Sequence, residues 1–282
     1  MGVMKRMHLV LLAAALLASG ARAASNDLSL SGLVDTTGST PNVDNARFRQ
    51  LSRELGLVLT PTAMQPAETT GQSGFDFALD YGFHAVRTEQ SYWQDTRESS
   101  TTPLLMTLGA RARKGFPLPV PLTSEVELGA NWIIDSQLVN LGGNVRVALN
   151  EGFRFIPDLA VSFGVNRLVG STDIDLFTMS AGGQISKGFG VFGSFNLCPF
   201  VGYQSIWVNG SSRLVDSNPA DTVNVDDNVV FALVPLAQNR IDRVSFGLRF
   251  VVAVVQLTSG IDVNMLDGKP LLQYGIRAGV ML

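Results

Sequence analysis

The sequence predicts an all-β fold, an up-and-down antiparallel transmembrane β-barrel of about ten strands preceded by a non-barrel N-terminal segment. The first observation behind this prediction is a side-chain alternation with period two, which recurs from residue 74 to residue 282. The second is a secretion signal ahead of the alternation, and the third is that no long apolar run comes after this signal. The strand number has a range of roughly 8 to 12, because strand boundaries are the least certain part of such a prediction.

The first 23 residues have the layout of a secretory signal peptide. Lys5 and Arg6 form a positive start, residues 9–18 are apolar, and residues 21–23 read Ala-Arg-Ala, an A-x-A cleavage site. We therefore expect residues 1–23 to be removed on export. Their removal takes three positive charges, including Arg22, and moves the formal charge from −3 to −6. An acidic mature chain disfavours nucleic acid as a partner.

The composition narrows the chemistry of the mature chain. Cys198 is the only cysteine and His84 the only histidine after cleavage, so we expect no disulfide, no metal site and no cofactor. Charged residues are only 16% while hydrophobic residues are 46%, which favours alternating membrane strands over apolar helices. The longest apolar run after the signal, residues 250–255, is far below the roughly 18 residues of a spanning helix. A membrane-inserted form would therefore be a barrel.

Residues 24–72 differ from the rest of the mature chain. Residues 35–41 are rich in turn formers, and residues 45–55 have apolar positions at helical spacing, which predicts a short amphipathic helix. Pro61 and Pro66 disfavour any regular element between this helix and the first strand. Two interpretations stay open: the segment is a plug folded into the lumen, or it is an arm on the periplasmic side.

The barrel itself is expected over residues 73–282. In each predicted strand one parity is apolar and the other is polar, charged or very small, as for Phe75, Phe77 and Leu79 against Asp76 and Asp80. Each strand is close to the 9–11 residues that a tilted membrane strand needs. The predicted strands are 74–86, 103–114, 123–134, 137–149, 157–167, 174–186, 198–209, 241–250, 252–264 and 271–282.

The connections between these strands predict the orientation of the barrel. Two of them, residues 87–102 and 210–240, are long and polar, and both come after strands that run in the same direction. Most of the connections at the other end are short. Outer-membrane barrels have short periplasmic turns and longer extracellular loops, so we expect the two long connections outside the cell.

The signal, the strand pattern and the last strand together resemble bacterial outer-membrane β-barrel proteins. Residues 273–282 keep the alternation of such a final strand, although Leu282 stands where the class usually has an aromatic residue. The resemblance covers residues 74–282 and is to the class as a whole. It implies the bacterial outer membrane as location, contact with membrane lipid and lipopolysaccharide, and insertion by the barrel-assembly machinery.

The polar parity supplies the candidate site residues. Their charges alternate in sign between neighbouring strands, which predicts cross-strand ion pairs. One interpretation is an ion-selective or solute-binding constriction, and the other is a charge ladder that fills a narrow barrel and makes it rigid. The candidate lumen-lining residues are Asp76, Asp80, His84, Arg111, Arg113, Glu125, Glu127, Arg146, Arg249, Asp262 and Arg277.

The functional prediction is a small, porin-like passive pore for the transport of small or apolar solutes. A sealed structural or surface-interaction barrel, which displays its loops to partners, is the first alternative. A soluble periplasmic binding sandwich is the second, because antiparallel sandwiches share the alternation of apolar and polar residues. We expect no enzyme and no catalytic residue, since His84 has no nucleophile signature near it.

Overall fold

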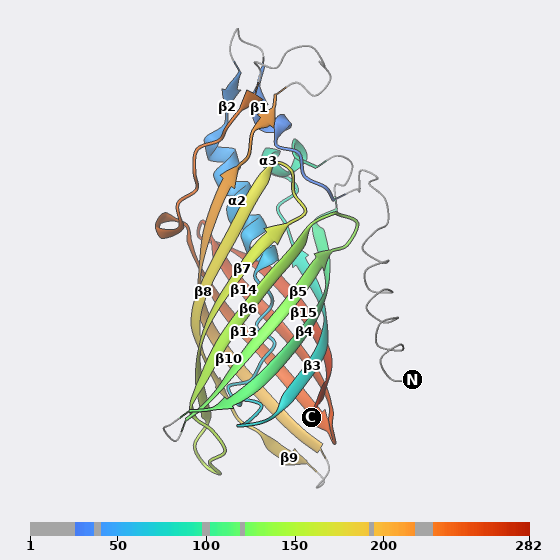
Figure 1. Ribbon diagram of the computed structural model, residues 1–282, viewed down its shortest axis with the longest axis vertical. Coiled ribbons are helices and arrows are strands. Elements are labelled where there is room, and N and C mark those ends of the chain that lie inside the picture. The colour runs from blue at the N-terminus through green and yellow to red at the C-terminus, as the bar shows by residue number, and fades with distance from the viewer. Residues whose placement is uncertain (1–25, 37–40, 98–101, 119–121, 192–194, 218–227) are drawn as a thin grey trace, which may run out of the picture.

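The computed structural model describes residues 26–36, 41–97, 102–118, 122–191, 195–217 and 228–282 of the protein. The predicted signal peptide therefore lies outside the described residues. Ten long strands form one closed antiparallel barrel, in which each strand pairs with its neighbours along the chain and β15 pairs with β3 (Figure 1). The strands are β3 (Phe75–Ala85), β4 (Leu104–Pro117), β5 (Thr123–Ile133), β6 (Val139–Asn150), β7 (Asp158–Val169), β8 (Ile174–Ser186), β10 (Phe195–Ser212), β13 (Arg240–Val252), β14 (Val255–Leu266) and β15 (Lys269–Met281).

The ten predicted strands and the assignment of their faces agree with this barrel. Apolar side chains of one parity lie on its outer surface, where Leu79 is 62% and Leu128 is 65% exposed. Side chains of the other parity face inward and are buried, as the alternating burial along β3 and β15 shows. A sandwich would bury the apolar parity between two sheets. The soluble sandwich is thus excluded, because the apolar face is on the outside of a closed barrel.

The barrel has two distinct ends. The long connections from β3 to β4 and from β10 to β13 leave and re-enter the barrel at one end, which we call the loop end, where the short turns 134–138, 170–173 and 267–268 also lie. At the other end, which we call the turn end, β4 connects to β5, β6 to β7, β8 to β10 and β13 to β14, and the C terminus lies there too (Figure 1). The shorter elements are η1 (Ser31–Leu33), β1 (Val34–Asp35), β2 (Asn42–Val43), α3 (Ser91–Gln94), β9 (Phe189–Val191), β11 (Val215–Asp216), β12 (Asn228–Val229) and η2 (Leu236–Gln238).

A single long helix, α2 (Asn45–Leu59), precedes the barrel and contributes nothing to its wall. The Asp44 side chain caps it by accepting a hydrogen bond from the Arg47 amide at 3.0 Å. It runs one turn beyond the predicted end at residue 55, up to Thr60, which Pro61 keeps out of the helical conformation. Within the described part of the chain, no helix is long and apolar enough to cross a membrane.

Candidate functional site: the barrel lumen

The lower half of the lumen, toward the turn end, contains a network of buried ion pairs. Arg113 donates to Asp76 at 2.5 Å, and Arg111 donates both to Asp80 and, at 2.7 Å, to Glu127. These side chains come from β3, β4 and β5, three neighbouring strands whose inward positions alternate in charge. Each of these charges has a partner of opposite sign on a neighbouring strand. The barrel wall therefore forms this network without the N-terminal chain.

All eleven predicted lumen residues are buried and lie on the inward parity. Arg146 of β6 pairs with Glu125 at 3.1 Å, and His84 shares a hydrogen bond with Thr107 at 2.9 Å. Their role as lining of an open pore remains a prediction. The buried set is Asp76, Asp80, His84, Arg111, Arg113, Glu125, Glu127, Arg146, Arg249, Asp262 and Arg277.

Sequence reasoning missed Arg243 of β13, which makes more contacts with the N-terminal chain than any residue it selected. The Arg243 side chain is fully buried and lies 3.3 Å from Asp262. Its guanidinium donates to the backbone carbonyls of Pro61 at 2.8 Å and Thr60 at 3.2 Å. The signal was present, since Arg243 has the same parity as Arg249 six residues further along the strand.

Residues 60–70, which we call the lumen segment, run without regular secondary structure through the charged half of the barrel. The Met64 carbonyl accepts from Arg277 at 3.4 Å, and the Pro66 carbonyl accepts from Arg146 at 2.9 Å. Nearer the turn end, Glu68 pairs with Arg249 and the Thr70 amide donates to Glu125 at 3.0 Å. The barrel side chains thus hold the segment largely through its backbone.

The upper half of the lumen, toward the loop end, is apolar and is occupied by α2. Phe48, Leu51 and Leu55 of the helix are fully buried, and Phe48 packs on Phe231 with ring centroids 4.9 Å apart. The approach is close, because a Cβ added at Gly56 would lie 2.7 Å from a methyl group of Val208 in β10. The inward wall residues of this apolar cluster are Leu105, Ile133, Leu168, Ile174, Leu176, Ile206, Val208, Ile241, Leu266 and Leu271.

A buried carboxylate links α2 to the first long connection. Glu54 accepts a hydrogen bond from the Tyr92 hydroxyl at 2.7 Å and one from the Arg87 amide at 2.6 Å. Burial is the largest influence and raises the pKa of Glu54, although both hydrogen bonds oppose it. Burial, together with the Glu54 charge, likewise raises the pKa of the Tyr92 hydroxyl. The docked helix therefore favours the protonated form of its own glutamate.

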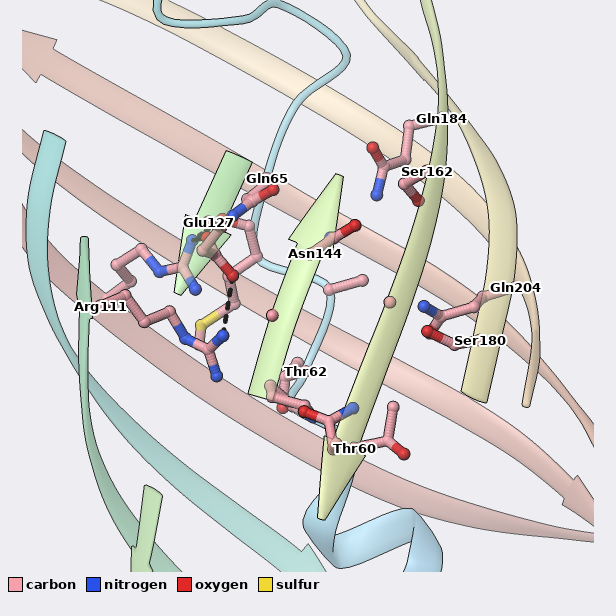
Figure 2. A pocket seen from close by; sticks show the side chains of 17 residues that line it. Thr60, Thr62, Gln65, Arg111, Glu127, Asn144, Ser162, Ser180, Gln184 and Gln204 are labelled. Carbon is pink, nitrogen blue, oxygen red and sulfur yellow. Dashed lines mark hydrogen bonds and ion pairs between the residues drawn. The ribbon is translucent and has the colours of Figure 1, made fainter. Parts of the chain in front are cut away.

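A small polar cavity of about 50 Å³ lies between the lumen segment and the opposite wall. Figure 2 shows Asn144, Ser162 and Gln184 on one side of it and Arg111 and Glu127 on the other. Within the described part of the chain, the side-chain oxygens of Asn144, Gln184 and Gln204 are buried without a hydrogen-bond partner. The space accommodates about three water molecules, which could satisfy these oxygens. The wall that β6, β7, β8 and β10 contribute to this cavity is thus polar but uncharged.

Taken together, the closed barrel, its apolar outer band and its polar interior define an outer-membrane β-barrel protein. The outer band implies a lipid environment, because apolar side chains cover the outside of nearly every strand. Contact with lipopolysaccharide, use of the assembly machinery and cleavage of a signal peptide remain predictions.

Comparison with solved structures finds barrels of the same kind at low sequence identity. The translocator domain of the autotransporter NalP from Neisseria meningitidis matches with a TM-score of 0.37 and 11% identity, covering 75% of this chain and 88% of that one. An outer membrane channel from Pseudomonas putida gives 0.35 and 10%, covering 77% and 98%. The attachment invasion locus protein of Yersinia pestis gives 0.27 and 8%, covering 75% and 99%. No protein family and no curated protein sequence matches this chain.

Proposed function

We propose that the protein is a sealed outer-membrane barrel that presents an ordered surface at its loop end. The observation that carries this proposal is the continuous occupation of the lumen by the chain from Phe48 to Thr70. The apolar face of α2 fills the upper half and a hydrogen-bonded segment crosses the lower half. Apolar burial holds the upper half in place, whereas hydrogen bonds and an ion pair hold the lower half. A change in salt concentration alone therefore does not release both halves.

The apolar part of the seal is the stronger barrier to opening. Burying a large apolar side chain contributes about 1.5–3 kcal/mol, and Phe48, Leu51 and Leu55 are all fully buried. Withdrawing α2 would expose these side chains together with the apolar wall that faces them. At equilibrium, therefore, the state with α2 docked is far more populated than the state with α2 withdrawn.

Planar-bilayer recordings test the sealed barrel. Purified, refolded protein that shows a heat-modifiable band is expected to give no single-channel steps across moderate voltages. A variant lacking residues 26–72 serves as the positive control, because it removes the apolar and the polar parts of the seal together. Regular conductance steps from the intact chain would contradict the proposal.

A passive pore for small solutes is the second candidate, and one observation favours it. Most ion pairs in the lumen join wall residues to each other, as in Arg113–Asp76 and Arg111–Asp80, so the wall stays paired when the lumen segment leaves. The lumen segment supplies one ion pair to the wall, through Glu68. The polar cavity beside it would then join the open path.

Solute uptake into proteoliposomes separates the two candidates. A gated pore predicts uptake of small solutes by the intact protein and faster uptake by Arg243→Gln, which loses donors to the segment's carbonyls. A sealed barrel predicts no uptake above that of empty liposomes in either case. Uptake by the intact protein would make the pore the better account.

A further inference from the structure

The N-terminal chain lies at the loop end of the barrel, far from where the first strand begins. The Asn26 side chain donates to the Ile134 carbonyl at 2.8 Å, and the Leu30 amide donates to Asp173 at 3.0 Å. Both partners belong to short turns at the loop end. Leu28 forms a β-bridge with Arg97 of the first long connection. Residues 26–36 and 41–44, which we call the cap, thus lie over this end, ahead of α2.

From the cap the chain crosses the whole barrel before β3 begins. Its contacts are ordered along β13, because Pro61 meets Arg243 while Glu68 meets Arg249, six residues closer to the turn end. At the turn end the Gly74 carbonyl accepts from the Gly115 amide at 3.0 Å, next to the C terminus. The chain therefore runs from the loop end to the turn end inside the barrel and then returns as β3 (Figure 1).

The direction of this crossing has a consequence for topology. In outer-membrane barrels the short turns face the periplasm and the longer loops face the outside. An exported chain arrives on the periplasmic side of the outer membrane, whereas the cap lies on the outer side. We propose that the barrel delivers its own N-terminal segment across the outer membrane and holds it on the cell surface.

This inference deepens the proposed display function, and it rests on that proposal for the reason why the cap is exposed. The cap is fixed in place, because α2 anchors it in the apolar mouth of the barrel. Arg53 also pairs with Asp267 in the turn between β14 and β15, and Arg49 donates to Asn239 at 2.7 Å. A polypeptide attached ahead of Asn26 would accordingly be displayed outside the cell.

Cysteine labelling of intact bacteria tests the topology on the full chain. The native Cys198 is buried and is replaced by alanine, which gives a background without thiols. Single cysteines are then placed at Asn42 in the cap, Glu89 in the first long connection and Arg154 in a turn-end connection, all of them exposed. The probe is a maleimide that does not cross the outer membrane.

We expect Asn42→Cys to label on intact cells to within about twofold of Glu89→Cys, as for two exposed sites on one side of a membrane. Arg154→Cys is expected to label only after the outer membrane is permeabilised. Labelling of Asn42→Cys only after permeabilisation would overturn the inference, as would an exchange of the two reference sites. Conductance by the intact protein with an unchanged labelling pattern would instead count against the seal alone.

Discussion

Arg277 and Asp80 form a bidentate ion pair across the seam where the last strand meets the first. The Arg277 Nε atom donates to Asp80 Oδ1 at 2.7 Å, and a terminal nitrogen donates to Oδ2 at 3.0 Å. The two residues are direct partners in the register of β15 with β3. Arg111 reaches the same carboxylate from β4, so Asp80 connects three strands at the closure of the barrel.

The substitution Asp80→Asn should destabilise the barrel. It removes the negative charge that the buried Arg277 and Arg111 share. Breaking a buried ion pair in this way typically lowers the free energy of unfolding by about 3–5 kcal/mol. The urea midpoint of unfolding, monitored by loss of the heat-modifiable band, measures the effect. Asp175→Asn is the matched control, because its pair with Arg167 at 2.8 Å lies on the outer surface and should contribute little. Equal midpoints for the two variants would argue against the seam network.

Gly275 of β15 leaves room for the lumen segment. A Cβ at this position would lie 2.6 Å from Met64 Sδ and 3.2 Å from Thr62 Cβ. Gly275→Leu should therefore displace residues 62–64 and lower stability by about 1–3 kcal/mol. Hydrogen exchange measured by mass spectrometry should show faster exchange at the displaced amides. Gly183→Leu is the control, since Gly183 has the outward parity, and unchanged exchange in Gly275→Leu would place the segment elsewhere.

The docking of α2 should weaken as pH rises. Burial raises the pKa of Glu54 in the docked state, so this state binds the proton more tightly than the undocked state. Docking is then strongest below the ordinary glutamate pKa and declines until the raised pKa is passed. A fluorescent probe attached at position 42 reports the release of α2 from the barrel in urea. The urea midpoint of this release should fall as pH rises across this range in the chain with Glu54, and it should stay nearly level in Glu54→Gln. A parallel fall in both proteins would assign the effect to another group.

The strand pattern and the inward parity could be predicted because each depends on local alternation. The burial of the eleven lumen residues could be inferred from that parity alone. The path of residues 60–70 could not be predicted in the same way, since several of its contacts use the carbonyls of Thr60, Pro61, Met64 and Pro66. Every residue has such a carbonyl, so these contacts leave no sequence signal. The sequence therefore left plug and arm as equal interpretations of residues 24–72, whereas in the structure residues 60–70 of this stretch lie in the lumen.

The reactivity of the native Cys198 tests the occupied lumen most directly. Its side chain is fully buried on the inward face of β10, opposite Arg249 of β13 in the register of the two strands. A small, charged thiol reagent is added to the folded protein in detergent, and the modified fraction is read by mass. We predict no modification while the barrel is folded and complete modification after heat unfolding. Rapid modification of the folded protein would show that solvent reaches the lumen and would contradict the account.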